Sequence, residues 1–171
     1  MSGILLGRHL LALPSPPPTD PVLAHEVSAL APGKMAVLHV LSTECRCSQR
    51  IAAHLTTTAR PAGVAETVLL VGDDAALEKR LASRGFVVKH ATDESLAKVW
   101  HVPAVPLLVV AAPDGSLPYV GGYTTTKQGY EIHDLELIAA AAHGRPTPLP
   151  LYGCAVSEGL KRDLDPTGAL R

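Results

Sequence analysis

Residues 38–55, LHVLSTECRCSQRIAAHL, decide how this chain folds. The stretch overlaps an apolar, β-branched run at 35–42, MAVLHVLS, which is typical of a buried strand. A helix pattern then runs from Cys45 to Ala59, so that Cys45 and Cys47 stand directly after the strand, where the helix begins. The stretch is therefore a strand–turn–helix unit with a pair of cysteines at the turn.

Strands and helices keep alternating along the rest of the chain. Such an order implies a parallel sheet with helices on both faces, and the Pro-Asp-Gly turn at 113–115 adds a hairpin that makes the sheet mixed. We therefore expect an α/β domain with three layers. The expected strands are 35–42, 66–71, 86–90, 107–112 and 117–120, and the expected helices are 22–31, 45–59, 75–83, 92–100 and 131–143.

The composition excludes several classes of protein. The chain has 171 residues, of which 47% are hydrophobic and 18% are charged, and its formal net charge is -1. A chain with these values can bury a core and is not disordered. Because it has no basic excess, we expect neither nucleic acid nor an anionic membrane surface as a partner. Its 3 cysteines are too few for a disulfide-scaffolded protein.

Two proline-rich runs mark the ends of the central domain. Residues 1–13 are apolar but shorter than the roughly 20 residues of a spanning helix, and their charge order does not match a signal peptide. The run PSPPPTDP at 14–21 is typical of a linker. We expect an N-terminal arm and linker at 1–33, the α/β domain at 34–144, and an extended tail at 145–171 that carries Cys154.

The chemistry of the cysteine pair follows from its position. A helix N-terminus presents unpaired N–H groups and a partial positive charge, which favour the thiolate form of a cysteine. Arg46 adds a positive charge beside the pair, and Glu44 adds a negative one. A thiolate is both a nucleophile and a ligand for soft metals, so Cys45 and Cys47 are the first candidate site residues.

A second candidate segment is Val105-Pro106, directly before the strand expected at 107–112. Proline has no N–H to donate to a sheet, so it fits at the first residue of a strand. An X-Pro bond at such a place can be cis, and cis prolines are functional features.

Together these segments resemble the thioredoxin superfamily over about 35–143. The matching parts are LHVLSTECRCSQRIAAHL at 38–55 and WHVPAVPLLVVAAPDGSLPYVGGY at 100–123. The resemblance implies a thioredoxin-like fold and a protein thiol or disulfide as substrate, without a cofactor. It also implies that Cys45 attacks, that Cys47 resolves, and that Pro106 is a cis-proline facing them.

Two subgroups look most similar. The additional strand and helix before Trp100 resemble TlpA-like proteins, which are periplasmic or membrane-tethered, although the sequence shows no targeting signal. The Gly121-Gly122 loop and Tyr152-Gly153-Cys154 resemble RedB-type proteins. The chain departs from the superfamily by having one residue instead of two between its cysteines, Glu44 in place of Trp, and Leu107 in place of Thr.

The short cysteine spacing indicates the direction of the reaction. A Cys45–Cys47 disulfide would close a tighter ring than Cys-x-x-Cys, and a strained disulfide is easier to reduce. We therefore expect an enzyme, a thiol–disulfide oxidoreductase that acts as an oxidant or isomerase.

The tail offers a third thiol. A helix of about 13 residues spans about 20 Å, and the ten residues that end at Cys154 can extend over about 30 Å. The tail is thus long enough to return Cys154 to the cysteine pair. A buried, inert cysteine is the alternative.

Three thiols in one place could also hold a metal. His101, in the loop before Val105-Pro106, is a further candidate ligand or a surface imidazole. The alternative function is therefore a Cu(I)- or Zn(II)-binding or metal-delivery protein that uses Cys45, Cys47, Cys154 and His101. Tyr123 is a candidate for lining a substrate groove at the same end, and an ordinary loop position is the alternative.

Overall fold

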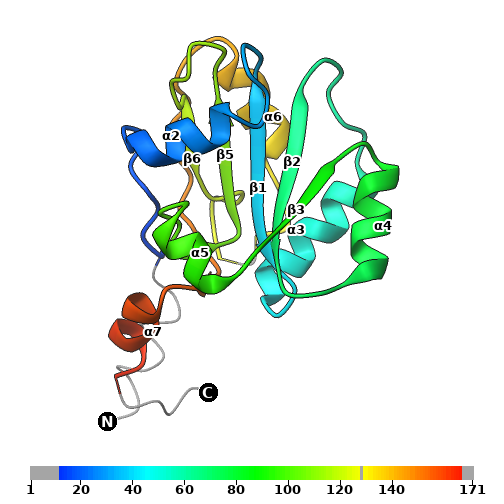
Figure 1. Ribbon diagram of the computed structural model, residues 1–171. Coiled ribbons are helices and arrows are strands. Elements are labelled where there is room, and N and C mark those ends of the chain that lie inside the picture. Colours follow the sequence, from blue (N-terminus) through cyan, green and yellow to red (C-terminus); the bar gives the residue numbers. More distant parts are fainter. Residues whose placement is uncertain (1–11, 128, 167–171) are drawn as a thin grey trace.

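The computed structural model describes residues 12–127 and 129–166, and its centre is a five-stranded mixed sheet (Figure 1). Its strands are β1 (Ala36–Ser42), β2 (Ala65–Val71), β3 (Val87–Ala91), β5 (Leu107–Ala111) and β6 (Tyr119–Gly121). They lie in the order β3-β2-β1-β5-β6. The first three are parallel, β5 is antiparallel to β1, and β6 is antiparallel to β5, so the α/β class with a mixed sheet is as predicted.

Helices cover both faces of this sheet (Figure 1). They are α2 (Pro21–Ser28), α3 (Arg46–Thr57), α4 (Ala75–Ser83), α5 (Asp93–Lys98) and α6 (Asp134–Ala141). A further helix, α7 (Glu158–Leu164), lies away from the sheet at the lower left of Figure 1. Successive strand residues face opposite sides, so Leu38 of β1 packs in one apolar layer with Leu23 of α2, and Val37 packs in the other with Leu55 of α3. Within the described residues, no helix combines the length and hydropathy that crossing a membrane requires.

Local capping explains where the shorter helices begin. The carboxylate of Asp74 accepts from the backbone N–H of Leu77 at 2.9 Å and starts α4. Thr92 and Ser95 form a reciprocal capping box at the start of α5. These signals are written in the sequence, which is why α4 has the predicted bounds.

The segments outside the central domain are also packed against it. Leu23 and Val27 of α2 are fully buried, although α2 lies within the expected arm and linker. Leu13 forms an isolated bridge with Leu151 of the tail. Most of the apolar segment expected at 1–13 lies outside the described residues.

The tail contains more structure than an extended strand. A second sheet pairs β4 (Ala104–Val105) with β7 (Cys154–Ala155). It is followed by α7, which Ser157 caps by accepting from Leu160 N–H at 3.2 Å. The sequence predicted neither β7 nor α7, because β7 has two residues and α7 is short, polar and without buried residues.

Candidate functional site

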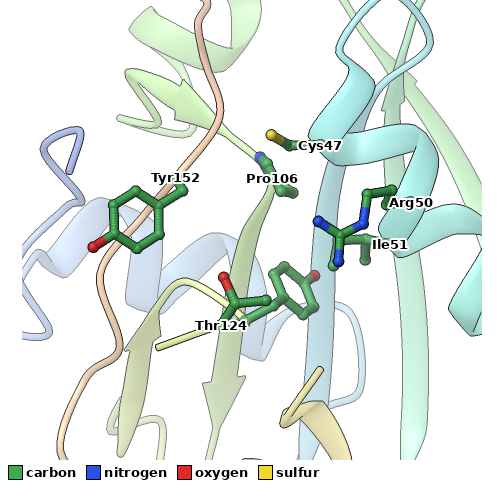
Figure 2. Close-up of a pocket in the computed structure, with 7 residues that line it drawn as sticks. Cys47, Arg50, Ile51, Pro106, Thr124 and Tyr152 are labelled. Carbon is green, nitrogen blue, oxygen red and sulfur yellow. The ribbon is translucent and has the colours of Figure 1, made fainter. Parts of the chain in front are cut away.

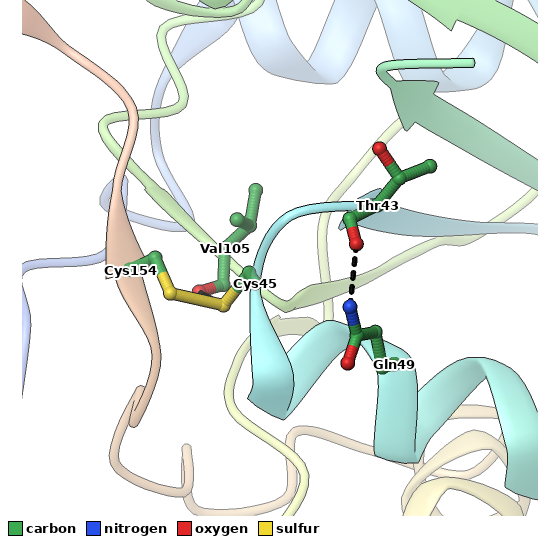
Figure 3. The surroundings of a disulfide bond; sticks show 5 residues. All are labelled: Thr43, Cys45, Gln49, Val105 and Cys154. Carbon is green, nitrogen blue, oxygen red and sulfur yellow. Dashed lines mark hydrogen bonds between the residues drawn. A yellow bond between two sulfur atoms is a disulfide. The ribbon is translucent and has the colours of Figure 1, made fainter. Parts of the chain in front are cut away.

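The turn between β1 and α3 holds Cys45 at the N-cap of the helix. The N–H of Cys45 donates to the carbonyl of Ser42 at 3.2 Å, and the Cys45 carbonyl accepts from the N–H of Gln49 at 2.9 Å. The Gln49 side chain closes the turn by donating to the carbonyl of Thr43 at 2.7 Å (Figure 3). Cys45 itself is only 2% exposed.

A disulfide joins Cys45 to Cys154 of the tail, with 6.0 Å between their Cα atoms (Figure 3). The tail does reach the cysteine pair, but the pairing differs from the expected Cys45–Cys47 disulfide, because Cys47 is a free cysteine. The geometry gives a reason for the difference. Residues two apart at the start of a helix do not face each other, whereas Cys154 arrives from the side of the helix N-terminus.

Backbone pairing holds the tail against the segment before Pro106. In the antiparallel pair of β4 and β7, Val105 lies opposite Cys154, and Ala104 lies opposite Ala155. A side chain at Gly153 would not fit, because its Cβ would overlap the carbonyl oxygen of Val105 and lie 2.6 Å from Cδ of Pro106. Gly153 is therefore required by close approach of two backbones.

A second glycine contact lies further back along the tail. The N–H of Gly122 donates to the carbonyl of Leu149 at 2.9 Å. A Cβ on Gly122 would overlap the carbonyl oxygen of Pro150, so the Gly121-Gly122 loop lets the tail pass directly over it. The two sequence features that resembled RedB-type proteins are thus parts of one contact surface.

The peptide bond between Val105 and Pro106 is cis. The Cys45 Sγ lies 3.9 Å from the carbonyl oxygen of Val105. Val105 and Pro106 are buried, so the structure brings together Cys45, Val105, Pro106 and Cys154 from the sequence-derived set.

Beside the disulfide lies a small pocket that is open to solvent. Figure 2 shows Cys47 and Pro106 between Tyr152 on the tail and Arg50 on α3. The complete lining is Cys47, Arg50, Ile51, Pro106, Tyr123, Thr124 and Tyr152. Cys47 is half-buried here, so its thiol lines the pocket next to the disulfide without taking part in it.

Sequence reasoning had proposed Cys47, Pro106 and Tyr123 at this place but had missed Arg50 and Tyr152. Arg50 could have been found, because it lies three residues after Cys47 and therefore on the same side of the helix. Its guanidinium donates to the carbonyl of Gly129, which ties α3 to the loop after β6. Tyr152 could be placed only once the path of the tail was known.

Tyr123 connects the pocket to a buried polar network. It is 2% exposed, and burial raises the pKa of its phenol well above the ordinary value. Its hydroxyl donates to the carbonyl of Leu107 at 3.3 Å and lies 3.0 Å from Nδ1 of His39. The hydroxyl at the pocket wall is therefore neutral and held in place.

Behind Tyr123, charged groups are paired across the core. His39 Nε2 donates to the carboxylate of Glu66 at 3.0 Å, and Arg60 joins Glu66 to Asp134 with Nη1 2.7 Å from Oδ2. Asp134 also accepts from His54 Nε2 at 2.7 Å. Burial alone would raise the pKa of Glu66, but hydrogen bonds from His39 and Arg60 lower it below the ordinary value. His39 and His54 thus belong to this network.

The other candidates are exposed. Glu44 and Arg46 are exposed at the start of α3. His101 is exposed, with a φ of 54°, and its Nδ1 lies 2.9 Å from the carboxylate of Asp20, which caps α2. Throughout residues 12–127 and 129–166, no three His, Cys, Asp or Glu side chains are grouped so that they could hold a metal ion. The Cu(I) or Zn(II) site remains a prediction.

Comparison with known families and curated proteins gives one match. The family model described as "Domain of unknown function (DUF6436)" matches residues 19–131. None of the curated proteins matches the sequence. The matched range includes α2 and the site around Cys45 and Pro106, and it ends before the tail.

Solved structures give the fold. A hypothetical protein, SMc02350, from Sinorhizobium meliloti 1021 is 16% identical with a TM-score of 0.57, over 75% of this chain and 82% of that one. An uncharacterized conserved protein from Geobacillus kaustophilus is 15% identical with a TM-score of 0.53, over 86% and 88%. A secreted Mycobacterium tuberculosis disulfide oxidoreductase, described as homologous to E. coli DsbE, is 21% identical with a TM-score of 0.50, over 67% and 84%. The fold of this chain is thioredoxin-like.

Proposed function

This chain belongs to the DUF6436 family, and we propose that it is a thiol–disulfide oxidoreductase that works through Cys45 and Cys154. The observation that carries the proposal is the placement of the disulfide. It lies at the N-cap of α3 and beside the backbone of Val105, on a thioredoxin-like fold. A structural disulfide would not need a helix N-terminus, whereas an exchanging thiolate is stabilised there.

The reaction starts from the reduced protein. The Cys45 thiolate attacks a disulfide of a partner protein, forms a new S–S bond with one partner cysteine, and releases the other as a thiolate. Cys154 then attacks Cys45 Sγ, and the partner cysteine leaves as a thiolate. The partner disulfide has been reduced to two thiols, and the Cys45–Cys154 disulfide has formed. Run in reverse, the same steps oxidise a partner dithiol.

The role of Cys47 distinguishes this scheme from one based on the Cys-x-Cys pair. In the Cys-x-Cys scheme, Cys47 resolves the mixed disulfide. In the scheme proposed here, Cys154 resolves it, and Cys47 remains a free thiol in the pocket. Each scheme predicts a different variant that traps the mixed disulfide.

The direction of electron flow depends on the reduction potential of the Cys45–Cys154 pair. A value well above the roughly -270 mV of thioredoxin favours an oxidant or isomerase, as proposed from the sequence, and a value near it favours a reductant. An oxidising compartment, such as the periplasm, suits a protein with a disulfide. We also propose the likeness to RedB-type proteins, and its support is the pair of sequence features Gly121-Gly122 and Tyr152-Gly153-Cys154.

The test is turnover of a protein disulfide by the reduced protein and its single-cysteine variants. Insulin reduction in the presence of dithiothreitol is the assay, and circular dichroism checks that each variant is folded. Cys45→Ser is expected to abolish turnover. For trapping, the reduced variants are freed of dithiothreitol before insulin is added. Cys154→Ser is then expected to accumulate a mixed disulfide at Cys45, whereas Cys47→Ser is expected to turn over in the assay and to accumulate none. Retained turnover in Cys45→Ser refutes the proposal, whereas a mixed disulfide that accumulates only in Cys47→Ser restores the Cys-x-Cys scheme.

A further inference from the structure

The tail occupies the site in the manner of a bound peptide. β7 adds to β4 as an antiparallel strand, and within the described residues β4 pairs with no other strand. The N–H of Val156 extends the contact by donating to the carbonyl of Pro103 at 2.8 Å. Strand addition of this kind takes its affinity from backbone hydrogen bonds and its selectivity from how the side chains fit the receiving site.

We propose that the tail and an extended segment of the partner protein take turns on β4, and that the partner segment must have glycine directly before its reactive cysteine. The proposal rests on the proposed function, because it concerns the peptide that reacts with Cys45. In it, residues 152–155 are a resident ligand whose sequence, Tyr-Gly-Cys-Ala, shows what the site accepts.

The glycine requirement follows from register. A partner cysteine bonded to Cys45 in the same register takes the place of Cys154, opposite Val105. The residue before it then takes the place of Gly153, where a Cβ would overlap the carbonyl oxygen of Val105. That oxygen belongs to the backbone of a residue that is fully buried, so it cannot move aside as a flexible side chain would.

The position before the glycine is not restricted in this way. Tyr152 lies at the pocket beside Cys47 and Arg50 (Figure 2), so its counterpart in a partner has room for a large side chain. The site therefore binds the backbone of the partner segment and requires that the residue directly before its cysteine has no side chain. The class of substrate is an extended Gly-Cys segment.

Because the tail and the partner segment occupy β4 alternately, two events of the reaction are coupled. When Cys154 attacks Cys45 Sγ in the mixed disulfide, the bond to the partner cysteine breaks and the partner leaves as a thiolate. The same movement returns β7 to β4 and removes the backbone contacts that held the partner strand. Resolution of the mixed disulfide and release of the product thus become a single step.

The test uses the full chain with the double substitution Cys47→Ser and Cys154→Ser, so that Cys45 is the one remaining thiol. Two peptides with the sequence of residues 151–157, one carrying Gly→Ala before the cysteine, are activated as mixed disulfides with thionitrobenzoate. Release of thionitrobenzoate measures the rate of bonding to Cys45. We expect the glycine peptide to react at least about tenfold faster than the alanine peptide. The tail competes equally with both, so the ratio is unaffected.

Two controls separate the possible failures. The two peptides must react with free glutathione at equal rates, and the double variant must react with Ellman's reagent, which needs no strand. Equal rates for both peptides at Cys45 would overturn the glycine requirement and leave the oxidoreductase proposal standing. A folded variant that reacts with neither peptides nor reagent would overturn the oxidoreductase proposal as well.

A second measurement uses the chain's own tail. In a glutathione redox buffer, Gly153→Ala is expected to lower the equilibrium constant for the Cys45–Cys154 disulfide at least about tenfold. Gly159→Ala is the matched control, because a Cβ at Gly159 meets nothing within 4 Å. If Gly153→Ala leaves the equilibrium where Gly159→Ala leaves it, the strand fit does not select glycine and the inference is wrong.

Discussion

Val105 is the antiparallel strand partner of Cys154. Its carbonyl oxygen also lies 3.9 Å from the Sγ of Cys45, so one buried residue contacts both cysteines of the disulfide. Any peptide that bonds to Cys45 in this register meets the same backbone. The position of Val105 is therefore the geometric reason why the tail and the disulfide act as one unit.

Breaking the disulfide should lower the stability of the fold. Cys45 and Cys154 are 109 residues apart, and closing a loop of about 100 residues removes up to about 5 kcal/mol of chain entropy from the unfolded state. We expect Cys154→Ser to reduce the free energy of unfolding in urea by about 2–5 kcal/mol relative to the oxidised protein. Cys47→Ser, which leaves the disulfide intact, is the control. Equal stability of the oxidised protein and Cys154→Ser would contradict this.

The buried network makes a prediction about Glu66. Glu66→Gln removes one of the two carboxylates that pair with Arg60 in the core and leaves Asp134 as the other. Removing one member of a buried ion pair lowers the free energy of unfolding by about 3–5 kcal/mol. Glu94→Gln is a matched control, because Glu94 pairs with Lys98 on the exposed surface. Urea unfolding should separate the two variants. A Glu66→Gln protein as stable as Glu94→Gln would show that the network contributes nothing.

Stability should also depend on pH through Glu66. Because its folded-state pKa lies below the unfolded value of about 4.3, Glu66 stabilises the fold above that value, and this contribution is lost as the pH falls through the folded pKa. We expect the free energy of unfolding to fall below about pH 4.3 and the fall to be shallower in Glu66→Gln. Urea titrations between pH 3 and pH 7 measure both curves. If the free energy of unfolding falls equally steeply with pH in the native protein and in Glu66→Gln, Glu66 is not the cause of the loss of stability in acid.

Removing one hydroxyl tests the wall of the pocket. Tyr123→Phe leaves Nδ1 of His39 without its partner at 3.0 Å, and an unsatisfied buried polar group costs about 1–3 kcal/mol. Tyr130→Phe is the control, because Tyr130 is 98% exposed. Thermal unfolding is the measurement. The idea fails if both variants melt at the same temperature.

The contact that holds the tail can be tested at a position away from the cysteines. Gly122→Ala is expected to lift the tail, because the added Cβ would overlap the carbonyl oxygen of Pro150. Chymotrypsin should then cleave after Tyr152, in the tail, faster than in the native protein. Gly144→Ala has open space around its Cβ and is expected to leave the cleavage rate unchanged. Equal rates in the two variants would mean that the tail is held elsewhere.

Much of the fold was predictable because its signals are local. The apolar runs of β1, β2 and β5 stand out in the sequence, and Asp74 and Thr92 mark helix starts by capping. The same holds for part of the site, since Cys45 and Pro106 are recognisable from the elements that follow them.

The remainder depends on contacts between distant segments. The pairing of Cys45 with Cys154, rather than with Cys47, depends on the path of the tail over Gly122 and Gly153. The network of His39, Glu66, Arg60, Asp134 and His54 joins groups up to 80 residues apart, and nothing in their spacing marks them as neighbours. Such contacts appear only when the whole chain is folded.

The disulfide also divides the chain mechanically. While Cys45 and Cys154 are joined, a force applied to the two ends of the polypeptide passes through the S–S bond and bypasses residues 46–153. An enzyme complex that unfolds proteins by pulling on one terminus would therefore stop at the disulfide, and most of the sheet would carry no force. Reduction removes that obstacle, so the redox state that frees Cys45 also exposes the domain to unravelling.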